Sequence, residues 1–244
     1  MTEDHYQTHI KQGNELTEKA LNEFDQAGNF EQTWIWLDLA GYHFSSANDL
    51  HWQAYLHHQK FQLAAHHKRD LQAYGLAQKT YQLYRCAFDH KGNIRFMLHW
   101  AQFLAEQGKL DQALSHLRIA MTLAAKWAPD QLPVIYISLG SEYVEQGAYI
   151  DAIRFLNQAL MDQSLPQEQE TWCLKLLADA FMGLYKPQKA EHLYRKVLQM
   201  ALDQSNHSLA KPVFACLQDL ETSLITGFST SDLALQAKSQ LKSL

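Results

Sequence analysis

Residues 97–120, MLHWAQFLAEQGKLDQALSHLRIA, decide the fold of this chain. The segment starts with a large apolar residue, and the residues three and seven positions after this start are also large and apolar. The residue four positions after the start is small. After a turn, a small residue follows at sixteen, a large one at twenty and a small one at twenty-three. Two helices cross closely only where a side chain is small. The spacing therefore predicts two antiparallel helices joined by a short turn.

The same pattern occurs twice more along the chain. It returns in residues 136–159, YISLGSEYVEQGAYIDAIRFLNQA, and in residues 174–197, LKLLADAFMGLYKPQKAEHLYRKV, where Val197 takes the last small position. The three segments start 39 and 38 residues apart. A period in that range is typical of solenoid proteins, in which each hairpin covers the apolar face of the next.

One glycine marks a close helix crossing. Gly140 occupies the position that Ala101 and Ala178 hold in the other two segments. We therefore expect α-carbons of neighbouring helices to approach closely at Gly140. A Leu there should overpack the crossing, whereas an Ala should be accepted, as it is in the equivalent positions.

Helical periodicity continues almost from end to end, and no convincing strand is present. We predict an all-α fold, a right-handed superhelical solenoid of antiparallel helical hairpins with about 12 helices. Residues 93–204 carry the three clear repeats. Residues 1–92 form a divergent, aromatic-rich helical region, and residues 205–244 supply polar capping helices at about 208–226 and 230–243.

The N-terminal region leaves two interpretations open. Its helices are expected over residues 29–47, 49–68 and 70–89, rich in Trp, Tyr and Phe. They are either degenerate repeats or a separate helical subdomain.

Composition excludes several classes of protein. The chain has 244 residues, of which 47% are apolar and 19% charged, as is usual for soluble globular proteins. Cys86, Cys173 and Cys216 are widely spaced, which argues against a disulfide scaffold or a structural zinc site and fits a reducing compartment. The chain shows no apolar leader segment and no run of 18 apolar residues. We expect a cytoplasmic protein that has no membrane span.

From these repeats, the chain resembles the tetratricopeptide repeat family over about residues 93–204. Its period is longer than usual in that family, and the proline that often closes a repeat is missing, as in longer helical repeats of bacterial regulators and sensor proteins. In the family, the first helix of each hairpin lines a concave groove. The resemblance implies groove positions at Arg95, Leu98, Gln102, Ile137, Ser141, Val144, Trp172, Lys175, Asp179 and Met182.

What the resemblance implies for function is a non-catalytic adaptor or scaffold that binds a protein or peptide in this groove. Family members that hold a chaperone's C-terminal carboxylate use Lys and Asn where this chain has Leu98, Gln102, Ile137 and Ser141, so that activity is not expected. Alternatives are a peptide-sensing regulator, a secretion chaperone, or a helical protein with a small-molecule pocket. Lys175 and Asp179, four residues apart, are expected to pair. Self-association stays open.

Charge and histidine are unevenly distributed. Residues 1–50 are acidic, whereas residues 51–100 are basic and rich in His. Basic residues interleaved with Tyr74, Tyr81 and Tyr84 suggest a nucleic-acid patch. The simpler interpretation is that the tyrosines belong to the core and the charges face water or the acidic first fifty residues, so we do not expect nucleic acid to be a partner.

Motifs for catalysis and metal binding are lacking. We find no nucleophile elbow, phosphate-binding loop, dinucleotide fingerprint or zinc-protease motif. His5 and His9 are four residues apart and would share one helix face, but no cysteine or suitably spaced carboxylate accompanies them. We therefore expect no enzyme activity, no cofactor and no metal.

Overall fold

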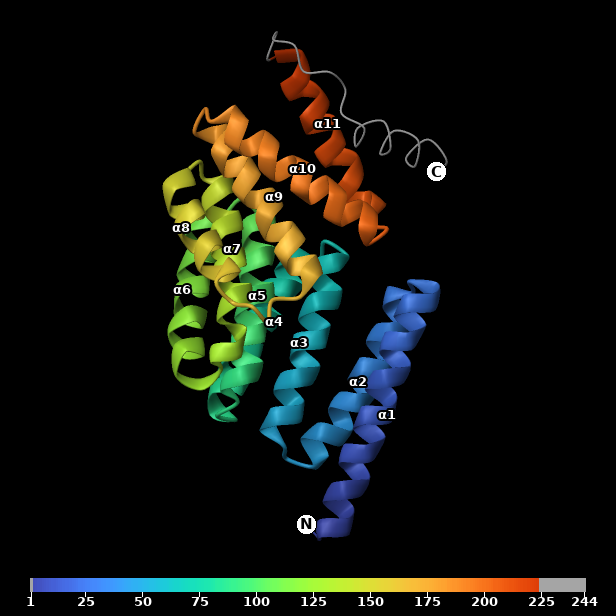
Figure 1. Ribbon diagram of the computed structural model, residues 1–244. Helices are drawn as coiled ribbons and strands as arrows, with labels where there is room; N and C mark the ends of the chain where they lie inside the picture. The colour runs from blue at the N-terminus through green and yellow to red at the C-terminus, as the bar shows by residue number, and fades with distance from the viewer. Residues whose placement is uncertain (1, 224–244) are drawn as a thin grey trace. The chain divides into compact units, whose positions relative to one another are not determined.

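The computed structural model describes residues 2–223, and this part of the chain is helical without a strand (Figure 1). The helices follow one another with short connections, as the periodicity predicts. Within the described part they are α1 (Glu3–Ala27), α2 (Phe30–Ser46), α3 (Leu50–His66), α4 (Asp70–Cys86), α5 (His90–Glu106), α6 (Leu110–Trp127), a 3-10 turn (Pro129–Gln131), α7 (Leu132–Glu145), α8 (Tyr149–Leu160), α9 (Gln167–Gly183), α10 (Pro187–Asp203) and α11 (His207–Ser223).

Successive helices pair into antiparallel hairpins: α1 with α2, α3 with α4, α5 with α6, α7 with α8, and α9 with α10. The last three hairpins are the three repeats identified in the sequence. The prediction of an all-α fold of repeated helical hairpins is therefore confirmed. Helix α11 packs on α10 and matches the first expected terminal helix. The second, at 230–243, lies outside the described residues.

The chain divides into two compact units at residues 129 and 130. Unit 1 holds α1 to α6, and unit 2 holds α7 to α11. The three regions expected from the sequence, 1–92, 93–204 and 205–244, remain a prediction about domain organisation. In the first of them, α1 to α4 form two hairpins of the same kind as the repeats that follow.

Turns in unit 1 recur at a constant interval. A residue with left-handed backbone stands in each turn, every 20 residues: Gly28, Asn48, Lys68, Phe88 and Gly108. After the last four, the next backbone N–H donates to the carbonyl five residues back, which closes the preceding helix. Asn29, Asp49 and Asp89 then accept hydrogen bonds from the first turn of the next helix. Because the same hydrogen bonds end and begin each helix between these turns, α2 to α5 are 17 residues long each.

The small residues of the repeats are buried where the helices cross. Ala101, Ala113 and Ala120 in the first repeat and Ala178 and Ala190 in the third are at most 1% exposed.

Gly140 faces Leu156 of α8, as the close crossing requires, and an Ala there would need the Leu156 side chain to shift. A Cβ built on Gly140 would lie 2.5 Å from Cγ and Cδ2 of Leu156, which is itself fully buried.

Unit 1 has an aromatic core. Phe61, Phe96 and Phe103 are at most 3% exposed and contact one another edge to face, and Tyr84 is equally buried beside them. Tyr74 and Tyr81 pack against the same cluster. The tyrosines of the basic segment thus serve the core, as the simpler interpretation held.

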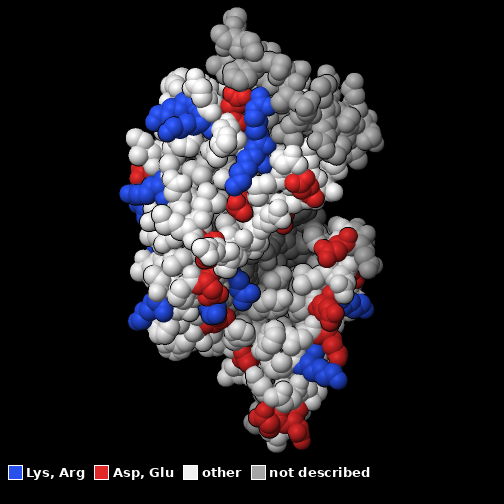
Figure 2. Space-filling model, viewed as in Figure 1, with Lys and Arg blue, Asp and Glu red and all other residues white. Residues whose placement is uncertain are grey.

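Several cations of the basic segment pair with the acidic first fifty residues. Lys60 Nζ lies 2.5 Å from Asp38 Oδ1, and Arg69 Nη2 lies 2.6 Å from Glu31 Oε1. Other acidic side chains gather where α1 begins, with Glu3 in the first turn (Figure 2). Carboxylates suit that position because the N-terminal end of a helix is electropositive.

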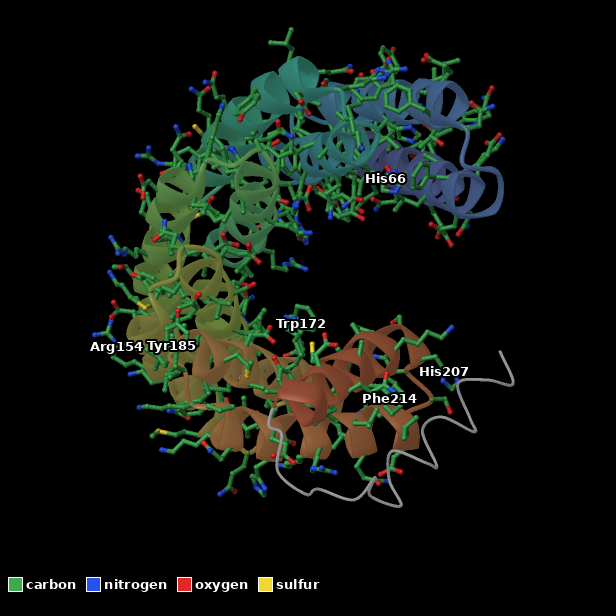
Figure 3. The ribbon with its side chains drawn as sticks, turned by 90° about the horizontal axis from the view of Figure 1, so that it is seen from above. His66, Arg154, Trp172, Tyr185, His207 and Phe214 are labelled. Carbon is green, nitrogen blue, oxygen red and sulfur yellow. The ribbon has the colours of Figure 1, made fainter. Side chains whose placement is uncertain are left out.

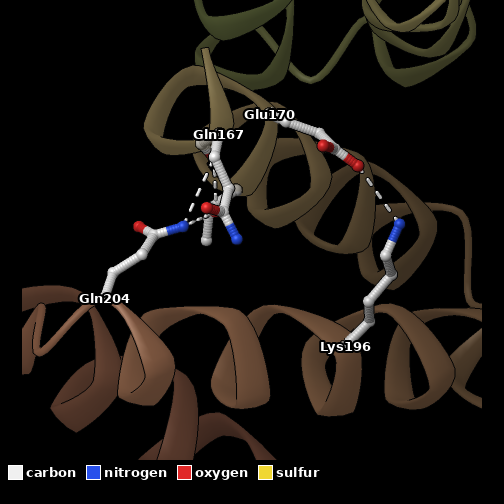
Figure 4. A network of polar contacts seen from close by, with 5 residues as sticks. Gln167, Glu170, Lys196 and Gln204 are labelled. Atoms are coloured by element: carbon white, nitrogen blue, oxygen red, sulfur yellow. Dashed lines mark hydrogen bonds and ion pairs between the residues drawn. The ribbon is translucent and has the colours of Figure 1, made fainter.

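In unit 2, α9 and α10 are joined by polar contacts along their length (Figure 4). The Gln204 amide donates to Thr171 Oγ1 at 2.9 Å, and Lys196 Nζ lies 3.2 Å from Glu170 Oε1. The fold of this hairpin therefore rests on side-chain hydrogen bonds as well as on apolar burial.

Candidate functional site

The described part of unit 1 contains a groove of about 830 Å³, which we call the unit 1 groove. Helices α1, α3 and α5, the first helices of the three hairpins, supply most of its lining, and α2 and the start of α4 supply the rest. Grooves of this size hold drug-sized molecules or several side chains of a peptide.

The unit 1 groove has an apolar floor and polar walls. The floor contains buried Phe61, Leu63, Phe103 and Leu37 together with half-buried Phe24. Four glutamine amides stand among the wall residues, which are Thr33, Gln59, Gln62, His66, Lys68, Asp70, His99, Gln102, Glu106 and Gln107. Figure 3 labels His66 among the helices of unit 1. The walls thus offer both hydrogen-bond donors and hydrogen-bond acceptors above an apolar floor.

A chain of hydrogen bonds runs from the core to the wall. Tyr84 Oη lies 3.2 Å from His58 Nδ1, and His58 Nε2 lies 2.7 Å from His99 Nδ1. The Gln62 amide nitrogen lies 3.2 Å from the same His99 nitrogen. His58 is 5% exposed, whereas His99 and Gln62 line the groove. We refer to the first three residues as the Tyr84–His58–His99 chain.

Both imidazoles of this chain are neutral at pH 7. Burial, followed by the charges of His99 and Arg95, lowers the pKa of His58 to about 3, and burial with Arg95 lowers the pKa of His99. Burial raises the pKa of the Tyr84 phenol, which keeps its proton. One set of donors satisfies both contacts along the chain: Tyr84 donates to His58 Nδ1, and His58 Nε2 donates to the single lone pair of His99 Nδ1. His99 then carries its proton on Nε2.

The groove positions inferred from the family resemblance fall on three helices. Arg95, Leu98 and Gln102 lie on α5, and only Gln102 among the ten lines the unit 1 groove. Ser141 and Val144 are partly exposed on α7.

Ile137, also on α7, is 7% exposed and is therefore more buried than Ser141 and Val144, and its place in a groove stays a prediction. The alternation of helix faces explains the difference, since residues at neighbouring positions of α7 switch between buried and partly exposed.

On α9, the expected residues form one cluster. Lys175 Nζ lies 2.7 Å from Asp179 Oδ2, which confirms the expected pair, and it sits over the ring of Trp172 at 5.2 Å. The Tyr194 hydroxyl donates to Asp179 Oδ1 at 2.6 Å. Trp172 lies on one side of unit 2, opposite Arg154 and Tyr185 (Figure 3).

Met182, the last of the ten, is 37% exposed near the end of α9. The structure therefore gathers the α9 set, while its use in binding stays a proposal.

Sequence reasoning missed Gln59, Gln62 and His99. A signal for them exists: His99 lies 40 residues after Gln59, and Gln102 lies 40 after Gln62, which is two turn intervals. Equivalent positions on α3 and α5 therefore share the same wall.

Histidines at the start of the chain come close to one another. His9 Nδ1 lies 3.1 Å from His43 Nδ1, and the rings of His5 and His9 are 5.2 Å apart. Residues 2–223 contain no group of three or more His, Cys, Asp or Glu side chains arranged to hold a metal ion. Among the helices that the structure describes, none has the length and apolarity to cross a membrane.

Comparison with known proteins agrees with the fold. The tetratricopeptide repeat sequence pattern matches residues 94–160. No curated protein matches the chain in sequence.

Among solved structures, a signal transduction ATPase with numerous domains (STAND) that has a tetratricopeptide repeat sensor, from Pyrococcus horikoshii, superposes on 96% of the chain with a TM-score of 0.77 and 14% identity. The chain spans 37% of that protein's length.

Two further structures are similar. BtubC from P. vanneervenii matches 84% of this chain and 92% of its own, with a TM-score of 0.68 and 11% identity. NprR, solved in complex with its cognate peptide NprX, matches 88% of this chain and 63% of its own, with a TM-score of 0.58 and 14% identity. Identities this low show the fold alone. Together with the repeat pattern at 94–160, they show that this chain has the helical-repeat fold found in tetratricopeptide repeat proteins.

Proposed function

We propose that the protein is a non-catalytic interaction scaffold that binds a peptide segment of a partner protein in the unit 1 groove. One observation carries the proposal: a groove of about 830 Å³ combines an apolar floor with four glutamine amides in its walls. Each amide can donate and accept, which suits the alternating N–H and C=O groups of a peptide main chain. The floor suits apolar side chains, whose burial supplies most of the affinity.

The similar structures support this proposal by analogy. One contains a repeat sensor and another was solved with a peptide bound, so a fold of this kind accommodates such ligands. A peptide-sensing regulator is the second candidate. The STAND protein favours it, because there the repeats form a sensor within a longer chain.

The cluster on α9 is a second surface that we propose for partner contact. Trp172 and Met182 are 42% and 37% exposed and flank the Lys175–Asp179 pair. Exposed aromatic and thioether groups beside a charge pair are usual at protein interfaces.

An array of decapeptides with randomised sequence tests the first proposal on the full chain. We expect binding to a subset of peptides, and loss of that binding in the double variant Gln59→Ala, Gln102→Ala. The matched control is Gln158→Ala, an exposed glutamine on α8. Thermal melting checks that all variants fold. Peptide binding that survives the double variant unchanged would refute the unit 1 groove as the site.

A further inference from the structure

Four residues form one stripe along α5. Arg95, His99, Gln102 and Glu106 follow at intervals of four, three and four, so they lie one above another on the same helix face. The last three line the unit 1 groove, and Arg95 extends the stripe by one turn beyond them. A ligand along α5 therefore meets Arg95 and His99 together.

Arg95 has an unmatched charge. Its side chain is exposed and makes no ion pair or hydrogen bond with any residue in the described part of the chain. Two cations of this segment differ, since Lys60 pairs with Asp38 and Arg69 pairs with Glu31. Arg95 thus presents a guanidinium that no acidic side chain of the described residues neutralises.

His99 adds a fixed donor beside this cation. With Nδ1 accepting from His58, the Nε2–H of His99 is the group left over, and it has no partner within residues 2–223. The buried Tyr84–His58–His99 chain fixes the ring, because rotation of His99 would break the 2.7 Å contact to His58. A preorganised N–H donor loses little entropy when an acceptor binds.

The charges around the chain are few. Arg95 acts on both imidazoles and lowers their pKa, and Asp89 and Tyr55 act on Tyr84. Asp89 is already engaged, since its carboxylate accepts from Gly92 N–H and lies 2.9 Å from His51 Nδ1. Within the described residues, no group of α6 shifts the pKa of either imidazole. Among the described residues, Arg95 is thus the charged side chain that shifts the pKa of both imidazoles, while the carboxylates of Asp70 and Glu106 line the same groove.

We propose, on the basis of the peptide groove above, that Arg95 and His99 form a subsite for the side-chain carboxylate of an Asp or Glu residue in the bound peptide. The guanidinium supplies a planar pair of donors and His99 Nε2–H supplies a third. The partner segment is then acidic at this point and apolar where it covers the floor.

Proton uptake accompanies binding at this subsite. A carboxylate beside His99 favours the imidazolium, so the bound state takes a proton from solvent as the pH falls. The buried chain accommodates it by reversing: His99 Nδ1–H then donates to His58 Nε2, and His58 Nδ1–H donates to the Tyr84 oxygen. Neither of these two hydrogen bonds is lost in the exchange.

The test uses an array of decapeptides immobilised through their C-termini, so that only side-chain carboxylates are free. Every peptide containing Glu is printed beside its Gln counterpart, and the full-length chain is applied at pH 5.5 and pH 7.5. We expect Glu peptides to bind roughly tenfold more tightly than their Gln counterparts, and the preference to be larger at pH 5.5.

Three variants separate the outcomes. Arg95→Gln and His99→Gln should lower the preference for Glu while retaining binding of the Gln peptides, and His99→Gln should also remove its pH dependence. Arg85→Gln removes an exposed cation from α4 and should change neither the preference for Glu nor its pH dependence. A preference for Glu that persists in Arg95→Gln, or binding without any preference, overturns the subsite but leaves the peptide groove intact. No binding to any peptide would instead refute the proposed function.

Discussion

Replacement of Gly140 by Ala gives the sharpest test of the repeat packing. The added Cβ would lie 2.5 Å from two atoms of Leu156, whereas ordinary contacts begin at 3.4 Å, so atoms must move by almost 1 Å. Leu156 is fully buried, so any shift of its side chain must displace neighbouring core atoms. Overpacking of this kind costs roughly 1–3 kcal/mol.

A second effect of the same substitution acts in the opposite direction. Ala is favoured over Gly inside a helix by about 1 kcal/mol. The net expectation for Gly140→Ala is therefore a loss of roughly 0–2 kcal/mol.

Gly75 provides the matched control. It lies inside α4, it is exposed, and a Cβ there would meet nothing within 4 Å. Gly75→Ala should therefore gain the full propensity term of about 1 kcal/mol. The difference between the two variants isolates the packing cost, measured by urea unfolding of the full chain or as a difference of several degrees in melting temperature.

The double variant Gly140→Ala, Leu156→Ala completes the cycle. Because truncation of Leu156 removes the clashing atoms, the two substitutions should cost less together than the sum of each alone. If Gly140→Ala stabilises the protein as much as Gly75→Ala does, Leu156 does not pack against α7 at Gly140 and the reasoning is refuted.

Three further predictions concern single side chains. Tyr185 is 92% exposed with φ of 56°, so Tyr185→Gly should relieve left-handed strain and raise stability by about 1 kcal/mol in thermal melts. Burial, then Glu145, raises the pKa of Glu142 to about 7, so the folded state binds this proton more tightly than the unfolded chain and stability falls as pH rises from 4.5 to 7. Glu142→Gln should remove this fall of roughly 1–3 kcal/mol, seen by melting at pH 5 and pH 8. Tyr84→Phe leaves His58 Nδ1 without its donor and should cost about 1–3 kcal/mol in urea unfolding, whereas an unchanged midpoint would mean that the hydroxyl does not serve the chain.

The fold could be predicted because its determinants are local. Small residues such as Ala101 and Ala113 stand at fixed distances within one hairpin, and both are buried as that spacing requires. Turn chemistry is equally local, since Asp49 and Asp89 sit where helices begin.

Distances between helices could not be predicted in the same way. The repeat pattern treats Gly140 and Ala101 as equivalent positions. It does not show that the Leu156 side chain lies within 2.5 Å of where a Cβ on Gly140 would be.

The unit 1 groove was largely missed because its residues come from separate hairpins. Gln102 was identified from the family resemblance. The role of His58 and His99 depends on the hydrogen bond between them, and the two residues are 41 positions apart in the sequence. In the sequence alone, single polar residues at helical spacing cannot be distinguished from the solvent-exposed face of a helix. Only the packing of α3 beside α5 turns them into a hydrogen-bonded wall.

The 20-residue turn interval of unit 1 makes the chain extensible in whole modules. Duplication of residues 50–89 would add one hairpin and place its first helix next to α5, in phase with the glutamines of α3 and α5. Insertion of a single 20-residue helix would instead turn every later first helix of a hairpin into a second helix. The glutamines of α3 and α5 would then no longer lie on the same wall of the groove. Under gene duplication, this protein can therefore lengthen the unit 1 groove only in steps of about 40 residues, each of which adds one hairpin.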